Sequence, residues 1–272
     1  MIDAHMHMVL DGVDWKSAIG RHQNGADIPW MKRTLAHYKA QGFTWLRDGG
    51  DRWGVSAAAK ALAADYGITY RTPLSPLYQS GHYGGIVGTS FDNLRQYHTA
   101  VVQLRSQGAD FIKIMISGLM DLHRFGVLTE EGLPDATIGQ MIHIAHEEGL
   151  AVMAHANGVK NVLAAAAAGV DSVEHGAYLN GEALAAMEQA GTVWVPTLST
   201  LAAPMGKGRF DDGILQAILD SALENIAAFH GYVAAGTDAG AWAVQHGTDL
   251  EYRLLLPLTD LDRGNIELMN KF

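Results

Sequence analysis

The sequence predicts an α/β protein built as a (β/α)8 TIM barrel, in which eight parallel strands alternate with helices around one core. Two observations predict this class: short apolar segments alternate with longer stretches of helical periodicity, and a glycine often precedes the next strand. No Pro/Gly/Ser-rich linker divides the chain, so residues 1–272 are expected to form a single barrel domain. A doubly wound open sheet is the alternative, although no G-x-G-x-x-G motif follows the first strand.

Eight segments have the length and apolar character of buried strands. They alternate with predicted helices along the chain, which favours parallel pairing through helical crossovers. Their ranges are 2–8, 43–48, 68–74, 110–117, 150–156, 170–176, 192–198 and 233–238.

The stretches between these strands carry apolar residues at three- and four-residue spacing, as expected for helices that bury one face. Residues 249–256 predict only a short eighth helix, and the tail after Pro257 is expected to be irregular. The helical spacing is seen at Leu94, Tyr97, Val101 and Leu104, and at Ile138, Met141, Ile142 and Ala145, and the closing glycines are Gly42, Gly67, Gly108, Gly149, Gly169 and Gly191.

Charge, hydropathy and cysteine content exclude several classes of function. Lys and Arg number 19 and Asp and Glu 29, so the net charge of -10 repels a phosphate backbone and disfavours nucleic acid as a partner. No apolar run is long enough to span a membrane, and the N-terminus lacks the pattern of a signal peptide, so a cytoplasmic location is expected. Because the chain has no cysteine, a transition metal could be held only by its 13 histidines or by carboxylates.

Polar side chains stand at the carboxyl ends of several predicted strands, and in a barrel those ends open on one face. His5 and His7 are two residues apart, so both point to the same side of the first strand. Lys113 shares a strand face with Phe111 and Met115, where an unpaired buried ammonium is costly. Each residue alone is common in structural roles, but their recurrence at the same strand end favours a metal site. Its predicted members are His5, His7, Lys113, His155, His175 and Asp238.

Five ordered motifs carry a resemblance to a known family: "DAHMH", "FIKIM", "MAHANG", "VEHGAYL" and "GTDAG". Together they resemble the metal-dependent amidohydrolase superfamily, and within it the imidazolonepropionase/prolidase-like branch. The resemblance covers nearly the whole barrel and implies two divalent metal ions per chain, with zinc as the expected metal. It implies that His5, His7 and Asp238 hold one ion, that His155 and His175 hold the other, and that Lys113, carboxylated by CO2, bridges them.

The resemblance also implies an activity, hydrolysis of a C–N amide-type bond in a cyclic amide, a dipeptide-like or an N-acyl substrate. Two metal ions would lower the pKa of a bridging water so that it acts as hydroxide, and Asp238 would take its proton. A phosphotriesterase-like or lactonase-like metal hydrolase remains an alternative, as does a catalytically silent barrel that binds a ligand. A small-molecule substrate is the expected partner, and assembly into a homo-oligomer is left open.

Four further residues are candidates for the site. His82 lies in the loop of residues 79–85, which resembles the Gly/His loop of those relatives and would stabilise an oxyanion or bind a substrate carboxylate. A mobile surface loop is the alternative there. Tyr178, Asn157 and His246 follow predicted strands and are expected to face the substrate, unless they only close their loops.

Two other polar groups are expected to be structural. Arg47 and Asp48 end the second strand and are expected to form an ion pair that supports the rim. His143, His146 and Glu147 lack the spacing of an H-E-x-x-H motif, so a solvated helix face is expected.

Members of the superfamily usually begin with a β-sandwich that the chain rejoins after the barrel. Here the barrel motif starts at Ile2, and little sequence follows Asp238. The sequence is therefore interpreted either as a barrel-only member without the sandwich or as a trimmed chain.

Overall fold

The computed structural model describes all 272 residues and contains two sheets of parallel strands. The first has the order β1-β2-β3 and the second the order β10-β9-β8-β7-β6-β4-β5. Each of the eight predicted strand segments contains a strand, and β4 and β5 are additional. The bounds are β1 Ile2–Met6, β2 Trp45–Asp48, β3 Thr69–Arg71, β4 Leu77–Gln79, β5 Thr89–Phe91, β6 Ile112–Met115, β7 Val152–Ala156, β8 Ser172–His175, β9 Val193–Val195 and β10 Tyr232–Val233.

The third predicted strand, 68–74, contains β3, and the next strand along the chain, β4, lies in the other sheet. β3 pairs with β2, whereas β4 pairs with β6. Pro73 and Pro76 lie between β3 and β4, and proline has no backbone N–H to donate to a neighbouring strand. The sheets stay in contact here, because the backbone N–H of Asp110 donates to the carbonyl of Thr72 at 2.9 Å.

The last predicted strand, 233–238, keeps regular strand geometry only at β10. Beyond β10 the chain still runs along β1: Ala4 N–H donates to the Ala235 carbonyl at 2.8 Å, and Asp238 N–H donates to the His5 carbonyl at 2.6 Å. Asp238 has a φ of 56°, which no regular strand residue adopts. The regular strand therefore ends early, but the second sheet remains hydrogen-bonded to the first.

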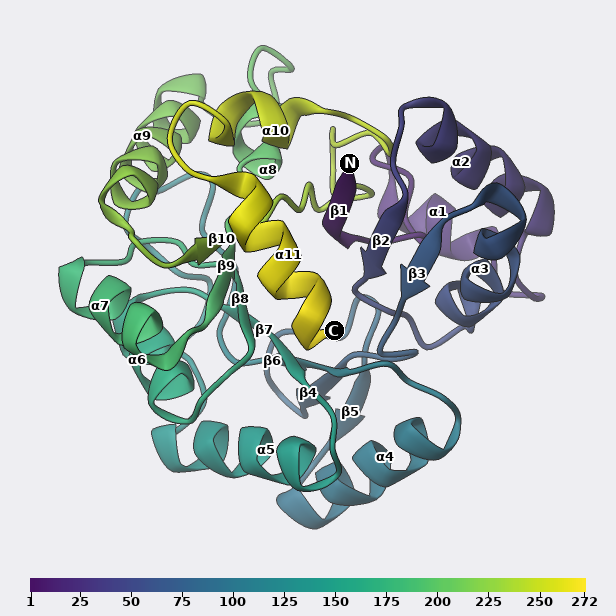
Figure 1. Cartoon of the computed structure of the whole chain (residues 1–272), viewed down its shortest axis with the longest axis horizontal. Helices are drawn as coiled ribbons and strands as arrows, with labels where there is room; N and C mark the ends of the chain where they lie inside the picture. Colours follow the sequence, from purple (N-terminus) through teal and green to yellow (C-terminus); the bar gives the residue numbers. More distant parts are fainter.

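Helices surround the strands (Figure 1). None of them combines the length and the apolar character that a membrane span requires. The α-helices are α1 Trp15–Gly20, α2 Ile28–Ala40, α3 Val55–Ala63, α4 Leu94–Ser106, α5 Asp135–Glu147, α6 Val159–Ala167, α7 Gly181–Ala190, α8 Ser199–Ala202, α9 Asp212–Ala228, α10 Leu250–Leu255 and α11 Leu261–Lys271, with a 3-10 turn, η1, at Ala64–Tyr66.

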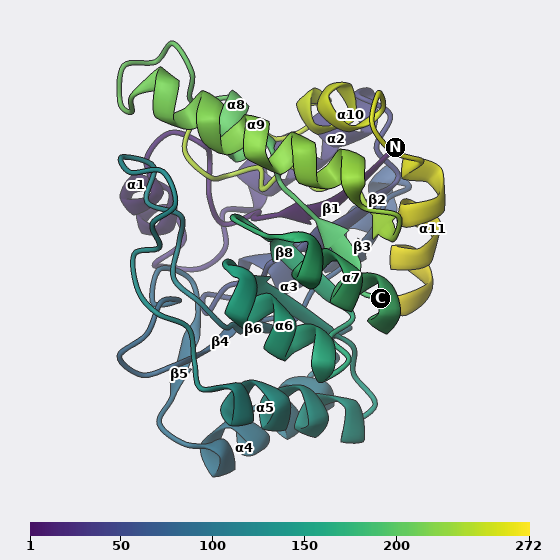
Figure 2. The ribbon, with the colours of Figure 1, turned by 90° about the vertical axis from the view of Figure 1, so that its left-hand side faces the viewer.

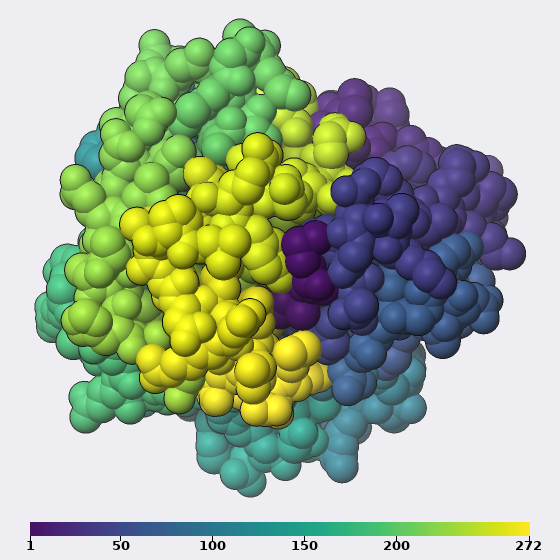
Figure 3. All heavy atoms as spheres, turned by 45° about the horizontal axis from the view of Figure 1, so that its top comes forward, coloured from purple at the N-terminus to yellow at the C-terminus, as the bar shows by residue number.

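The expectation of an irregular tail after Pro257 is wrong, because α11 follows it. The Asp260 side chain caps this helix by accepting a hydrogen bond from Arg263 N–H, and Leu261 and Leu268 are buried. The helix lies across one end of the strands, and α1 lies towards the opposite end (Figure 2). In Figure 3 the C-terminal segment, in yellow, spreads over one face of the molecule beside the N-terminal residues, in purple.

The strands separate two apolar regions, as predicted by the alternating direction of side chains along each strand. Ile112 and Ile114 pack outward into the large core between strands and helices, together with Met141 of α5. Phe111 faces the other way and packs with Met153 in a smaller cluster that includes residues of both sheets. Because side chains alternate along a strand, Lys113 shares this inner side with Phe111.

Candidate metal centre

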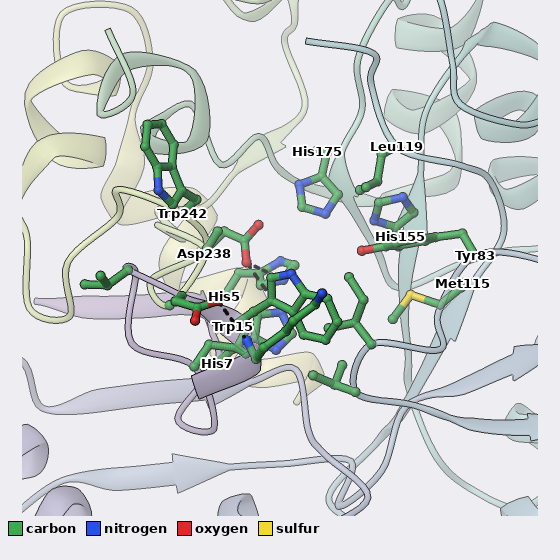
Figure 4. A pocket seen from close by; sticks show the side chains of 18 of the residues that line it. His5, His7, Trp15, Tyr83, Met115, Leu119, His155, His175, Asp238 and Trp242 are labelled. Carbon is green, nitrogen blue, oxygen red and sulfur yellow. Dashed lines mark hydrogen bonds and ion pairs between the residues drawn. The ribbon is translucent and has the colours of Figure 1, made fainter. Parts of the chain in front are cut away.

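The six predicted metal-site residues come together at one end of the strands, although they arise from five separate segments (Figure 4). Ligand atoms of His5, His175 and Asp238 all lie within 4.8 Å of one another. The Asp238 Oδ1 atom is 3.6 Å from His5 Nε2 and 3.4 Å from His7 Nε2. The rings of His155 and His175 have centroids 4.6 Å apart. This arrangement offers imidazole nitrogens and a carboxylate to a common centre.

Lys113 lines the same cavity from β6 and is 1% exposed. Its Nζ atom has no hydrogen-bond partner. Burial lowers the pKa of this amine to about 8, although Glu174 and Asp238 oppose the shift. A buried amine without a partner is unfavourable as an ammonium ion, so the site favours a neutral or modified lysine.

Burial also keeps the four histidines neutral. It is the largest cause that lowers the pKa of His7 and of His155 to about 3, and the positive charge of Lys113 adds to it. The pKa values of His5 and His175 are likewise held well below the ordinary histidine value, mainly by burial. A neutral imidazole has a free lone pair, which is the form that binds a metal ion.

Three of the histidines are oriented by a hydrogen bond on one ring nitrogen. His5 Nδ1 lies 2.7 Å from Glu174 Oε2, and His175 Nδ1 lies 2.7 Å from Thr197 Oγ1. His155 Nε2 lies 3.1 Å from the carbonyl of Gly118. Such contacts fix the tautomer of a ligand histidine and leave the opposite ring nitrogen for the metal.

Glu174 is a residue that sequence reasoning missed. It is fully buried and accepts hydrogen bonds from Arg47 Nη2 at 2.8 Å and from Ser172 Oγ at 2.5 Å, in addition to its contact with His5. The sequence contains a signal for this role, because an acidic residue stands directly before His175 in a buried strand. Glu174 follows Ser172 by two positions, so both side chains face inward.

The expected ion pair between Arg47 and Asp48 is not formed. Consecutive strand residues point to opposite faces, so Arg47 points to the inner side of the sheets and pairs with Glu174. Asp48 instead accepts a hydrogen bond from the hydroxyl of Tyr70. Both side chains are buried, so neither forms a solvent-exposed rim.

The backbone is strained where three strands reach the site. His175, Thr197 and Asp238 have φ values of 67°, 52° and 56°, a left-handed region that residues with a Cβ rarely adopt. Observed strain of this kind is concentrated at functional sites, where the surrounding structure holds it. Here the strain lies at His175 and Asp238, two prospective ligands, and at Thr197, the hydrogen-bond partner of His175.

A cavity of about 560 Å³ opens above these residues. Its walls come from the loops that follow the strands and include Tyr83, Leu119 and Trp242, with Trp15 of α1 at the mouth (Figure 4). The volume is that of a small-molecule site lined by apolar groups with a few converging polar atoms.

Two of the other predicted site residues support loops beside the cavity. Asn157 donates its amide N–H to the Gly118 carbonyl at 3.1 Å and accepts from Ala177 N–H at 2.9 Å, so it ties together the loops after β6, β7 and β8. Tyr178 packs against Phe125, with ring centroids 5.5 Å apart, and does not line the main cavity.

His82 and His246 lie outside the main cavity. The His82 Nδ1 atom is 3.7 Å from a carboxylate oxygen of Glu130. His246 is buried, with Nδ1 3.1 Å from the Tyr38 hydroxyl and Nε2 2.9 Å from the Leu10 carbonyl. These contacts hold the loop after β10, and His246 is not among the residues that line the main cavity.

The three α5 residues that were expected on a solvent-exposed helix face lie on such a face. His143, His146 and Glu147 are exposed, and His146 pairs with Asp171 at 2.8 Å. They take no part in the cavity.

The comparisons with known proteins agree with the geometry of the site. No family model matches the chain. Ochratoxinase from Aspergillus niger is 28% identical over 273 aligned positions, which cover 86% of this chain and 55% of that protein. The chain thus spans about half the length of the curated relative that it matches.

Solved structures show the same fold. A Xaa-Pro dipeptidase with bound methionine has a TM-score of 0.77 at 20% identity, covering 98% of this chain and 72% of that one. An amidohydrolase has a TM-score of 0.77 at 22% identity, covering 100% and 71%. The structure of A. niger ochratoxinase has a TM-score of 0.75 at 22% identity, covering 99% and 68%. The relative in sequence and the neighbours in fold agree with the amidohydrolase superfamily, which confirms the resemblance indicated by the strand-end motifs.

Proposed function

We propose that the chain is a metal-dependent hydrolase that cleaves a C–N amide-type bond in a small molecule, namely a cyclic amide, a dipeptide-like or an N-acyl compound. The observation that carries this proposal is the cluster of four neutral histidines and Asp238 around the unpartnered amine of Lys113 at the base of a cavity. The names of the similar proteins, ochratoxinase and Xaa-Pro dipeptidase, support the same reaction class.

The scaffold proposed for this site is a single closed barrel of eight strands. In this interpretation β3 and β4 are two halves of one strand, and residues 235–239 extend the last strand along β1. The hydrogen bonds from Asp110 to Thr72 and from Ala4 to Ala235 support closure at the two seams. A barrel places the carboxyl ends of all eight strands at one mouth. The proposed metal ligands stand at the ends of different strands, so they need this arrangement to lie close together.

Two buried atoms that lack a hydrogen-bond partner support the fit of these residues to a pair of metal ions. Lys113 Nζ and His7 Nδ1 both lack a hydrogen-bond partner, although each is buried. Carboxylation of Lys113 would turn a neutral amine into an anionic ligand with two oxygens, and this requires the lowered pKa that burial produces. The donor set contains imidazole and carboxylate and no thiolate, which fits zinc and other first-row divalent ions.

In the proposed assignment each ion has its own histidine pair. His5, His7 and Asp238 would hold one ion, His155 and His175 would hold the other, and carboxylated Lys113 would supply an oxygen to each. When bound, such ions supply a nucleophilic hydroxide near neutral pH and polarise a carbonyl group.

The protein's own residues then orient the reaction and move the proton. Asp238 accepts a proton from the attacking water at a carboxylate oxygen and delivers it to the departing amine nitrogen. Its Oδ1 atom lies between His5 and His7, so the carboxylate already faces the reacting centre. In the metal-free site, burial raises the pKa of Asp238 to about 8, although the positive charge of Lys113 opposes the shift.

The cavity mouth favours a substrate that carries a carboxylate. Lys16 and Arg209 line it, in a chain whose net charge is -10, and one acidic residue, Asp14, lines it beside Lys16. Arg209 is held over the Trp242 ring at 4.8 Å, so the guanidinium remains next to the cavity. An N-acyl amino acid or a dipeptide has such a group, whereas a simple lactone or a phosphotriester does not.

The test is a comparison of bond types on zinc-reconstituted protein in the presence of bicarbonate. N-acyl amino acids and dipeptides should be hydrolysed, and chelation should abolish the activity until zinc is returned. Aryl phosphotriesters and lactones serve as competing substrates. Hydrolysis of those two classes with no amide cleavage would overturn the proposed bond specificity, and no hydrolysis of any class would favour a ligand-binding barrel.

A further inference from the structure

We propose that a second, smaller pocket beside the prospective metal ligands selects the substrate by the side chain of the amino acid on the amine side of the cleaved bond. The side chain that fits is a single aromatic ring, so the substrate class is N-acyl derivatives of phenylalanine. This inference rests on the proposed amide hydrolysis and deepens it. The residues that determine this specificity are Leu122, Phe210 and Trp242.

This side pocket has a volume of about 180 Å³ and branches from the main cavity. Both are lined by His155, His175 and Asp238, so each of them opens at the prospective metal ligands. Figure 4 shows Trp242 and Leu119, which also line the side pocket, on either side of His175. A bond held at these ligands therefore has room for one of its two substituents in each space.

The wall of the side pocket is largely apolar and comes from three segments. Leu122 lies between β6 and α5, Phe210 between α8 and α9, and Trp242 in the loop after β10. The rings of Phe210 and Trp242 pack edge to face, with centroids 5.7 Å apart and planes at 84°. On the side of the loop after β6, Phe210 also packs against His123, with centroids 5.2 Å apart.

The size of the side pocket limits what enters it. An apolar cavity of about 150 Å³ holds one benzene molecule, so the side pocket matches one six-membered ring. A fused pair of rings would need the wall at Phe210 to move. A glycine derivative would leave the pocket unfilled and lose the contact with its apolar wall.

Arg209 indicates which half of the substrate enters the side pocket. It is the one Lys or Arg side chain that lines this pocket, and it also lines the main cavity. Its guanidinium carbon lies 5.3 Å from the centroid of the Phe210 ring and 4.8 Å from that of the Trp242 ring. A cation is therefore next to the apolar wall, at the place where the two spaces meet.

An N-acyl amino acid carries its carboxylate and its side chain on the same carbon, next to the amide nitrogen. Binding of the carboxylate to Arg209 directs the side chain into the side pocket. The acyl group then extends into the main cavity, whose volume of about 560 Å³ accepts acyl groups of different sizes.

The first test compares substrates of the zinc-loaded full chain. The kcat/KM for N-acetylphenylalanine should exceed that for N-acetylglycine and for N-acetyltryptophan by at least about 10-fold, the low end of what a hydrophobic pocket discriminates. N-phenylacetylglycine carries its ring on the acyl side and should also be at least about 10-fold poorer. Equal values for the phenylalanine and glycine derivatives, or a preference for N-phenylacetylglycine, would overturn the proposal.

The second test changes the pocket wall and uses ratios of kcat/KM within one protein, so that differences in metal content cancel. Phe210→Ala should widen the pocket and raise the ratio of tryptophan to phenylalanine derivative about 10-fold, whereas Leu122→Trp should fill it and remove most of the preference for phenylalanine over glycine. Phe125→Ala is the matched control, because Phe125 is an exposed aromatic residue of the same loop as Leu122 and lines neither space. Unchanged ratios in both wall variants would refute the role of the pocket.

The third test does not depend on turnover. Phosphonamidates of phenylalanine and of glycine, in which a methylphosphonyl group replaces the acyl group, are titrated by calorimetry into the zinc-loaded chain. The wild type should bind the phenylalanine compound at least about 10-fold more tightly, and Leu122→Trp should lose this difference. If the difference is found but no amide is hydrolysed, the proposed function fails and the side pocket stands. Amide hydrolysis with equal binding of the two compounds would leave the proposed function and overturn the side pocket.

Discussion

The carboxylate of Glu174, in β8, accepts a hydrogen bond from Nδ1 of His5, in β1 of the other sheet, at 2.7 Å. The two residues are 169 positions apart in sequence, and neither is exposed to solvent. With its Nδ1 occupied, His5 presents Nε2 towards Asp238. A buried carboxylate thus determines which nitrogen of a prospective metal ligand is free.

Glu174→Gln should weaken both the metal site and the fold. Arg47, Ser172 and His5 all donate to this carboxylate, and an amide would turn its NH2 group towards one of those donors. Loss of one partner of a buried ion pair typically costs about 3–5 kcal/mol, and loss of a ligand's supporting carboxylate about 10–100-fold in metal affinity. Urea unfolding and zinc titration measure the two effects. Glu224→Gln, on the exposed side of α9, is the matched control, and equal behaviour of the two variants would contradict the role of Glu174.

Lys113→Ala should lose bound metal and activity together. An ammonium ion between two divalent cations is electrostatically unfavourable, so the bridging role requires the carboxylated form. A short carboxylic acid in solution should restore part of both properties by supplying the missing oxygens. Metal analysis by mass spectrometry, with and without added acid, checks this outcome. Full activity with two ions bound in Lys113→Ala would exclude a bridging lysine.

Asp238→Asn should fold normally but turn over slowly. The amide nearly matches the carboxylate in shape but cannot accept the water proton, and loss of a general base lowers kcat by about 100- to 10,000-fold. Steady-state kinetics should be measured beside the metal content, because Asp238 is also a proposed ligand. A variant that keeps its metal and a near-wild-type kcat would show that another group takes the proton.

The stability of the fold should fall as pH rises through neutrality, in part because of Glu251. Burial raises the pKa of this carboxyl from 4.5 to about 7, against hydrogen bonds from Leu198 and Ser199. The folded state therefore favours the protonated acid, and its contribution is complete below 4.5 and is lost as pH rises through 7. The slope reaches at most about 1.4 kcal/mol per pH unit.

Thermal unfolding between about pH 5 and about pH 8 isolates this effect when the wild type is compared with Glu251→Gln. The wild type should lose Tm relative to the variant as pH rises, because glutamine does not titrate. Parallel pH profiles for the two proteins would assign the pH dependence to other buried carboxyls.

The strands and the metal-site residues could be predicted because strand geometry repeats. Period-two alternation places Lys113 on the inner side, and the common carboxyl end of parallel strands brings His5 and His175 together. Loops have no such period, so the sequence did not indicate that Tyr83 enters the cavity while His82 lies outside it. The partner of Arg47 is 127 residues away, and nothing local to the second strand identifies it. The tail helix α11 was missed because Pro257 was interpreted as the end of regular structure.

The break between β3 and β4, at Pro73 and Pro76, has a consequence for how the molecule unfolds. His5 and His7 belong to the three-stranded sheet, whereas Lys113, His155 and His175 belong to the seven-stranded one. In the proposed assignment Lys113 would bind the ion that His5 and His7 hold, so this ion would cross-link two sheets that the backbone joins by a few hydrogen bonds. At a free concentration 100 times its dissociation constant, one such ion adds about 2.7 kcal/mol to the stability of the native state. Metal loading would thereby oppose separation of the two sheets as the molecule unfolds.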